Sequence, residues 1–410
     1  MQSLPASKIL MVDGVDEDPR TRARAERLRA HMPADEVRHV SDEELNGVFA
    51  EILPNLRRHG MNRDIKPVVV FNRFRFDDPE EVQAQRIEAY PWIRDSKLNG
   101  YGGFDWRPSG SSQYRRETGL VCQPAWHIHT VVGCHFRCAY CNLGWFVNVM
   151  LNLEDYVDRL DDNLARCPEQ RLFQWDNYTD VACWEPEYGC AKLLIDYFAG
   201  RRRQALLLYV GKSDHVDYLL DYDHRGHTVC CWSLSGRTQS AAFERGSASM
   251  EARIESMRKC QEAGYPVRVR LSPIIPVRNW REENRAMLEY LFERVKPDVV
   301  TMETIRFLDY GAMCEAFDLA LLDEGLVRTM REAQGAERLQ GCELPHAYRE
   351  KVYAFIINEM ERLSPETPFA FCRATAQMWR VFEPKLAQHG QTAKRYFCNC
   401  GPHCAPATAV

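Results

Sequence analysis

The sequence lacks an apolar run long enough to cross a bilayer. Its first residues, Met1 to Pro5, lack the basic and then apolar segments of a secretory signal. No internal repeat or low-complexity run is visible either. These absences argue against a membrane partner, and we expect a cytoplasmic protein.

The chain also has little excess charge of either sign. Its 53 Lys and Arg residues nearly balance its 58 Asp and Glu residues, which gives a net charge of −5. Such a balance leaves no global electrostatic footprint for nucleic acid. Any nucleic-acid contact would therefore need a local basic patch.

Cysteine, in contrast, is abundant, with 16 residues in a chain of 410. A secreted protein would pair so many thiols as disulfides, whereas a reducing compartment leaves them free for metal chemistry. The composition therefore favours metal chemistry in a reducing compartment.

Three of the cysteines are closely spaced. Cys134, Cys138 and Cys141 have the spacing C-x3-C-x2-C. A [4Fe-4S] cluster binds four soft ligands, so three thiolates leave one iron open for a substrate or cofactor. Structural zinc sites prefer paired knuckles that close four ligands. A zinc-binding structural protein stays open as an alternative.

Alternating apolar and amphipathic segments predict an α/β fold. We expect a small N-terminal α/β subdomain and linker over 1–113, a partial (β/α)6 barrel of the TIM type over 114–310, and a helical extension with a Cys-rich tail over 311–410. In parallel barrels the active site lies at the C-terminal ends of the strands. The cysteine loop follows the first expected barrel strand at that end.

The elements expected in this scheme are the following. Strands are predicted at Lys8–Asp13, Val68–Phe71, Ile128–Val132, Leu172–Trp175, Ala205–Val210, Thr228–Leu234, Val267–Ser272 and Val299–Thr304. Helices are predicted at Leu153–Ala165, Tyr188–Phe198, Asp214–Leu220, Ser249–Ala263 and Trp280–Val295.

The aromatic Tyr140 precedes the third cysteine, and with the spacing this resembles the radical S-adenosylmethionine (SAM) superfamily. The resemblance implies that SAM binds the open iron and is cleaved reductively to a radical. Tyr140 would then contact the cofactor. An electron donor such as flavodoxin or ferredoxin would be a partner.

Within the superfamily, the sequence is similar to the spore photoproduct lyase group. Val210-Gly-Lys-Ser-Asp214 resembles a segment whose lysine reaches the SAM carboxylate, which implies that role for Lys212. The resemblance also implies that Ser233 contacts the methionyl part of SAM. The segment from Phe243 to Arg253 is similar to the family's glutamate-to-arginine signature.

One position departs from the family pattern. The lyase returns a hydrogen atom from a cysteine just after the second strand, and Asn177 stands at that position here. Because an amide is a far poorer hydrogen-atom donor than a thiol, we expect a substrate other than spore photoproduct. Tyr178 and Cys183 are the candidate replacements for the missing donor.

A second cysteine group lies near the C-terminus. Cys398, Cys400 and Cys404 could hold a second metal, an auxiliary cluster or As(III), with Cys372 or His403 as a fourth ligand. Unoccupied thiols are the alternative.

His127 and His129 share one face of the first barrel strand. Two such histidines can ligate a metal, but core packing or support of the cluster is favoured. Glu303 and Arg306 are equally compatible with an internal ion pair and with substrate binding.

Four functions follow from these patterns. The leading one is a radical SAM enzyme that acts on a small-molecule substrate or a modified nucleic acid. The second transfers a 3-amino-3-carboxypropyl group from SAM to a soft atom, such as arsenic, on the C-terminal cysteines. The third is a DNA photoproduct lyase, which would need a groove for a flipped dinucleotide. The fourth is the zinc-binding structural protein.

Overall fold

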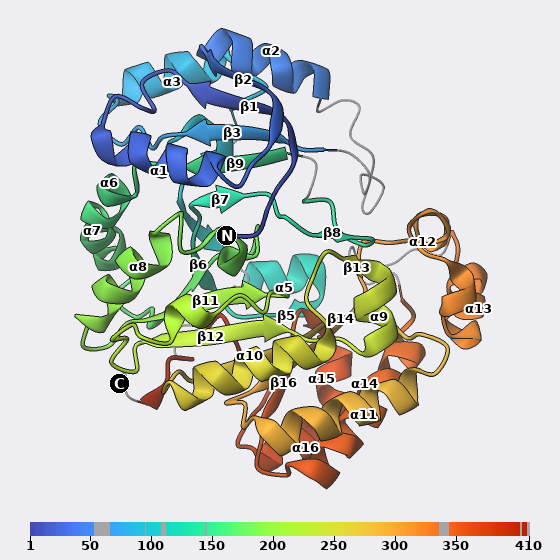
Figure 1. Ribbon diagram of the computed structural model, residues 1–410. Coiled ribbons are helices and arrows are strands. Elements are labelled where there is room, and N and C mark those ends of the chain that lie inside the picture. Colours follow the sequence, from blue (N-terminus) through green and yellow to red (C-terminus); the bar gives the residue numbers. More distant parts are fainter. Residues whose placement is uncertain are drawn as a thin grey trace.

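The computed structural model describes residues 1–52, 66–94, 96–107, 112–143, 146–335, 344–401 and 404–407. Two mixed β-sheets, covered by helices, form the body of the protein (Figure 1). The predicted α/β class is therefore confirmed.

The N-terminal sheet has five strands in the order β2-β1-β3-β9-β7. The first four are parallel to one another, and β7 runs antiparallel to β9. The apolar β1 and β3 occupy its centre, as expected for parallel strands buried on both faces. The bounds are β1 Ala6–Val12, β2 Ala34–Val40, β3 Val68–Asn72, β7 Val131–Val132 and β9 Phe146–Met150.

The larger sheet has eight strands in the order β16-β15-β14-β12-β11-β10-β6-β4. Its strands are parallel except for β4, which pairs antiparallel with β6. The edge strands β4 and β16 do not pair, so the sheet is open, as expected for a partial barrel. The bounds are β4 Phe104–Arg107, β6 Ala125–Ile128, β10 Leu172–Trp175, β11 Ala205–Gly211, β12 Thr228–Ser233, β14 Val267–Ile274, β15 Val300–Thr304 and β16 Phe369–Phe371.

Long helices cover the outer face of this sheet (Figure 1). Ser249 begins the central one, α10, by accepting a hydrogen bond from the Ala252 backbone N–H at 3.1 Å. The covering helices are α8 Cys190–Ala199, α10 Met250–Glu262, α11 Trp280–Arg294 and, beside α11, α14 His346–Leu363.

The remaining elements are shorter or peripheral. The helices are α1 Pro19–Arg29, α2 Asp42–Ile52, α3 Glu80–Ala89, α4 Ser96–Asn99, α5 Ser112–Thr118, α6 Leu153–Asp158, α7 Leu160–Ala165, α9 Arg237–Phe243, α12 Tyr310–Ala316, α13 Glu324–Glu332, α15 Ala376–Val381 and α16 Glu383–Gln388. The short strands are β5 Leu120–Val121, β8 Arg137–Cys138, β13 Glu244–Arg245 and β17 Ala374–Thr375. Among the described helices, none combines the length and apolar character required to span a bilayer.

Three predicted elements differ from the structure. The single helix expected at Leu153–Ala165 is two short helices, α6 and α7, which are separated at Arg159. The strand expected at Ile128–Val132 is divided, because the chain leaves the large sheet after Ile128 and joins the N-terminal sheet as β7. The helix expected at Asp214–Leu220 is only a 3-10 turn at Asp217–Leu219. There the carbonyls of Ser213 and Asp214 accept side-chain hydrogen bonds from β12 and α10 instead of forming helical bonds.

The sheets also cross the predicted domain boundaries. Strand β9 lies in the predicted barrel segment but completes the N-terminal sheet, whereas β4 and β16 lie outside that segment and extend the large sheet. The division into 1–113, 114–310 and 311–410 stays a prediction. The two sheets are continuous in sequence at β6 and β7.

The inner face of the large sheet is polar and carries the C-terminal tail. In-register neighbours of parallel strands share a face, which places Gln174, Arg268 and Thr301 inside. Thr301 accepts a hydrogen bond from Asn399 at 3.1 Å, and Arg268 donates to the Cys404 carbonyl at 2.6 Å. The tail therefore packs inside the barrel rather than on its surface.

Replacing Arg268 with Ala should release this tail. Arg268 is fully buried, and its loss leaves the carbonyls of Cys398 and Cys404 without their donor. Unsatisfied buried groups cost about 1–3 kcal/mol each, so we expect urea unfolding to show a loss of about 3 kcal/mol. Limited proteolysis should cut the tail faster. Arg258→Ala, a control at a partly exposed arginine, should change neither, and equal resistance of both variants would contradict the tail assignment.

Candidate active site

The loop that carries the three predicted cluster cysteines begins at a constrained glycine. Gly133 has φ +109°, and a Cβ there would lie 2.3 Å from the Phe146 carbonyl oxygen. Its N–H donates to the Tyr178 carbonyl at 3.0 Å, which links the loop to the end of β10. Only glycine fits this close approach of β7 to β9.

The loop is fixed at its other side by a two-residue strand pair. Cys138 in β8 lies opposite Glu244 in β13, and the Ala139 N–H donates to the Phe243 carbonyl at 2.7 Å. The Leu143 N–H points at the Cys141 sulfur at 3.4 Å. The three cysteines therefore lie on one loop held by backbone bonds at both ends.

The raised pKa values of these three thiols show that their thiolate forms need a stabilising positive charge. Burial raises the pKa of Cys134 and Cys141, and it raises the pKa of Cys138 to about 12. Thiolates at these positions require a bound cation to stabilise them. Three soft donors with N–H groups directed at sulfur fit a cluster that retains one open iron.

A buried ion pair lies directly beneath the loop. Arg253 of α10 donates to Glu244 at 2.6 Å, and the two side chains are 0% and 1% exposed. Arg253 also donates to the Ser233 carbonyl and to the hydroxyl of Ser247. Burial would raise the pKa of Glu244, but the charges of Arg253 and Lys212 outweigh it and lower this pKa to about 2. Glu244 is therefore a fixed anion.

Glu244 positions Tyr140, the aromatic residue before the third cysteine. The Tyr140 hydroxyl donates to the Glu244 carboxylate at 2.8 Å. The Lys212 ammonium lies 5.6 Å from the centre of the Tyr140 ring. Within the described part of the chain, no carboxylate lies within ion-pair distance of this ammonium. A cation thus stands beside the cysteine loop, and the predicted contact of Lys212 with SAM stays a prediction.

Asp180 and Cys183 lie behind the same loop. Asp180 accepts a hydrogen bond from the Lys212 backbone N–H at 2.6 Å, and burial raises the pKa of its carboxyl to about 7. The Cys183 thiol is fully buried and lies 3.5 Å from Asp180. Gly211 leaves room for this carboxylate, because a Cβ there would lie 2.4 Å from it.

Ser233 lies on the inner face of β12. Its hydroxyl is 2.6 Å from the Tyr209 hydroxyl, and the Arg270 guanidinium lies 5.2 Å from the centre of the Tyr209 ring. Ser233 is 1% exposed. Its predicted contact with SAM stays a prediction.

Glu303 and Arg306 form the internal ion pair that was one of their two expected roles. Arg306 donates to Glu303 at 2.8 Å, and the Ser272 hydroxyl donates to the same carboxylate at 2.9 Å. Burial opposes the charge of Glu303, but the guanidinium groups of Arg306 and Arg270 lower its pKa. This network orders the ends of β14 and β15.

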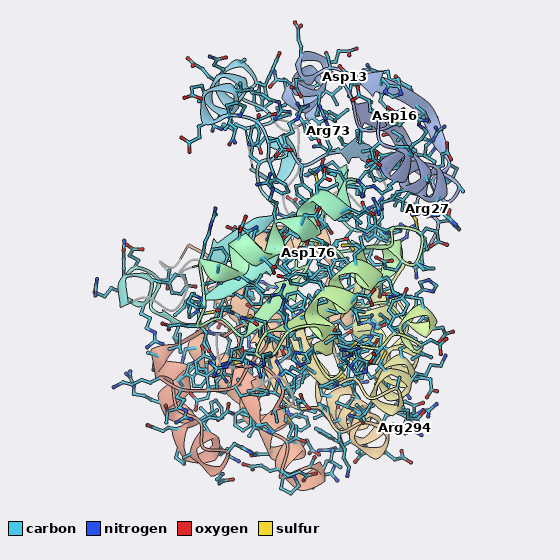
Figure 2. The ribbon with its side chains drawn as sticks, turned by 90° about the vertical axis from the view of Figure 1, so that its left-hand side faces the viewer. Asp13, Asp16, Arg27, Arg73, Asp176 and Arg294 are labelled. Atoms are coloured by element: carbon cyan, nitrogen blue, oxygen red, sulfur yellow. The ribbon has the colours of Figure 1, made fainter. Side chains whose placement is uncertain are left out.

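His129 lies directly after the last residue of β6. His129 Nδ1 is 2.7 Å from Asp176, and the Tyr178 backbone N–H donates to the same carboxylate oxygen at 2.9 Å. The rings of His129 and Tyr178 are 4.6 Å apart. Figure 2 shows Asp176 in the middle of the molecule, below the blue N-terminal sheet. Tyr178 is thus held between the two sheets.

The family model "Spore photoproduct lyase" matches residues 123–311, which include the cysteine loop, Lys212, Ser233 and the Glu244–Arg253 pair. Residues 123–311 therefore resemble a spore photoproduct lyase domain.

Curated relatives match a similar share of the chain. Spore photoproduct lyase of Bacillus subtilis (strain 168) is 30% identical over 189 residues, which are 44% of this chain and 55% of the relative. Spore photoproduct lyase of Geobacillus sp. (strain Y412MC61) is 30% identical over 162 residues, which are 38% of this chain and 47% of the relative. The chain thus spans about half the length of these relatives.

Solved structures share the fold over a longer stretch. A spore photoproduct lyase mutant with bound AdoMet and dinucleoside spore photoproduct matches with a TM-score of 0.60 and 16% identity, covering 90% of this chain and 99% of that chain. Spore photoproduct lyase complexed with dinucleoside spore photoproduct matches with a TM-score of 0.60 and 17% identity over the same shares.

The C-terminal cysteines lie near Gln123 and Gln174, and Gln174 is on the inner face of the large sheet. The Cys398 and Cys404 sulfurs lie 3.4 Å and 3.8 Å from the same Gln123 nitrogen, and the Cys400 sulfur lies 3.7 Å from Gln174. Cys372 lies 3.9 Å from Arg270. Metal binding by these cysteines stays a prediction, and His403 lies outside the described residues.

Sequence reasoning missed the roles of Asp176 and Asp180. Both follow the strand Leu172–Trp175, where the polar run Asp176 to Asp180 was considered only for Asn177 and Tyr178. Carboxylates directly after a buried parallel strand are a usable signal, since the strand ends meet at the site. Their partners, His129 and the Lys212 backbone, were not evident from sequence spacing.

Removing the charge of Glu244 should reduce the amount of iron that the cysteine loop holds after reconstitution. Glu244→Gln leaves Arg253 as a buried, unpaired cation, and breaking a buried pair costs about 3–5 kcal/mol. We expect a destabilised protein that retains less than half of the reconstituted iron, measured by urea unfolding and iron analysis.

Glu251→Gln is the matched control, because Glu251 pairs with Arg237 at the surface. It should retain full iron and stability. Equal iron contents and unfolding midpoints in both variants would contradict the role of the ion pair.

Proposed function

We propose that this chain is a radical SAM enzyme whose [4Fe-4S] cluster is held by Cys134, Cys138 and Cys141. The observation that carries the proposal is the loop of three thiols with a fixed tyrosine and a cation beside it. The match of residues 123–311 to the spore photoproduct lyase family model, and the 30% identity to a curated lyase, support the same function.

When bound, the cluster supplies the electron that cleaves the SAM sulfonium reductively. The residues of the chain would bind SAM and orient it. Lys212 would neutralise the SAM carboxylate, Ser233 would contact the methionyl part, and Tyr140 would pack against the cofactor. A flavodoxin or ferredoxin is the proposed electron donor.

The proposed substrate is a modified nucleic acid or a small molecule other than spore photoproduct. The solved relatives bind dinucleoside spore photoproduct, which supports the nucleic-acid class. Asn177 stands where the family places its donor cysteine, which argues against the same lesion. Tyr178 is the favoured donor, because its ring is partly exposed whereas the Cys183 thiol is fully buried.

The reaction is tested by anaerobic reconstitution, reduction with dithionite and addition of SAM, with the nucleoside products separated by mass. We expect 5′-deoxyadenosine from the wild type and none from Cys138→Ala. Methylthioadenosine as the main product would instead support 3-amino-3-carboxypropyl transfer, for which the relatives give no support. Stoichiometric zinc without SAM cleavage would refute both enzyme proposals.

Lys212→Met should weaken SAM binding while leaving the cluster intact. A hydrogen bond to a charged group contributes about 1.5–3 kcal/mol, which corresponds to about a 10- to 100-fold rise in the SAM dissociation constant. Lys192→Met is the control, because Lys192 pairs with Asp196 on the surface of α8. Unchanged SAM affinity in Lys212→Met would contradict the assignment.

The substrate proposal is tested with dinucleoside spore photoproduct. We expect the wild type to cleave SAM without turning over this compound, because Asn177 cannot return a hydrogen atom efficiently. Asn177→Cys restores a thiol and should permit measurable turnover. Turnover by the wild type at the rate of Asn177→Cys would contradict the proposal.

A further inference from the structure

A second set of metal-ligating side chains lies at the open edge of the large sheet and contains no cysteine. Asp105 of β4 lies directly opposite His127 of β6 in an antiparallel pair, and His129 follows two residues later on the same face. One ligand atom from each residue lies within 4.8 Å of the other two. Both histidines are buried, and Asp105 is exposed.

His129 is oriented as a metal ligand usually is. Its Nδ1 is bonded to Asp176 at 2.7 Å, and metal-bound histidines typically use their second ring nitrogen for such a carboxylate. The opposite nitrogen, Nε2, is buried and has no hydrogen-bond partner among the described residues. His129 is 4% exposed. A buried ring nitrogen without a partner needs an explanation, and a cation supplies one.

We propose that Asp105, His127 and His129 bind one divalent transition-metal ion of the zinc or iron(II) class. Two imidazoles and one carboxylate suit these ions and leave coordination positions open. Bonds of about 2.0–2.2 Å bring ligand atoms to roughly 3–3.5 Å from one another, so the set must contract slightly on binding. The exposed Asp105 carboxylate is the member free to rotate inward.

The site is separate from the cluster loop in both ligands and chemistry. Asp176 acts as a positioning residue, since it holds the His129 ring and at the same time the Tyr178 backbone N–H. The Tyr178 ring packs against His129 at 4.6 Å, so the bound ion would lie beside the candidate hydrogen-atom donor. Metal binding here does not depend on the proposed radical SAM function.

Binding is tested with Mn²⁺, which prefers oxygen and nitrogen ligands and ignores thiols. The full-length, cluster-loaded protein is first freed of loose metal with a chelator and kept oxidised, so that the [4Fe-4S] cluster gives no paramagnetic signal. Loss of the six-line signal of free Mn²⁺ then reports binding. We expect one Mn²⁺ per chain, displaced by Zn²⁺ added in excess over the free thiols.

Variants identify the ligands. Asp105→Asn and His129→Gln should each weaken Mn²⁺ binding at least tenfold, and Asp176→Asn should weaken it about 10- to 100-fold through loss of ring orientation. Asp105 is exposed, so Asp105→Asn tests the site without risk to the core.

The controls are Asp221→Asn, at an exposed aspartate, and His227→Gln, at a buried histidine whose Nδ1 lies 2.8 Å from the Gln204 carbonyl. Both should bind Mn²⁺ like the wild type. Absence of Mn²⁺ binding, or binding that Asp105→Asn and His129→Gln leave unchanged, would overturn the proposal.

Discussion

The buried Glu244–Arg253 ion pair is the interaction on which the candidate active site depends. Two opposite charges with almost no exposure are stable only when each is fully hydrogen-bonded, and both are. Glu244 also carries the strand pair to Cys138 and the bond to Tyr140. One carboxylate therefore connects the cysteine loop, the aromatic residue beside it and the helix α10 beneath it.

The candidate functional residues of the large sheet lie at successive levels along its inner face. The cysteine loop lies beyond the C-terminal ends of the strands, and Ser233 and Glu303 occupy the strand ends themselves. Two residues earlier, Cys231 and Thr301 face the tail that carries Cys398 to Cys404. Because parallel strands keep in-register residues on one face, a polar interior of this kind is set by strand alternation. The helices take the apolar outer face.

Most strands of the large sheet and the three cysteines of the candidate site could be predicted from the sequence. Strong apolar runs predicted β10, β11, β12 and β14 to within two residues at each end. The division of β6 from β7 could not be predicted, because nothing local to Ile128–Val132 shows that Val131 pairs with a strand of another sheet. Likewise, spacing indicated three cluster cysteines, but the contacts of Asp176 and Asp180 depend on residues more than 30 positions away. Tertiary pairing, not local propensity, decided each of these.

The central claim is that the loop of Cys134, Cys138 and Cys141 holds a cluster with an iron open to SAM. It is tested most directly by electron paramagnetic resonance of the reduced, reconstituted protein with and without SAM. The account predicts a [4Fe-4S] signal whose g-values shift when SAM is added, and no such signal in Cys138→Ala. A cluster signal that SAM leaves unchanged, or a SAM-responsive cluster signal that survives Cys138→Ala, would contradict it.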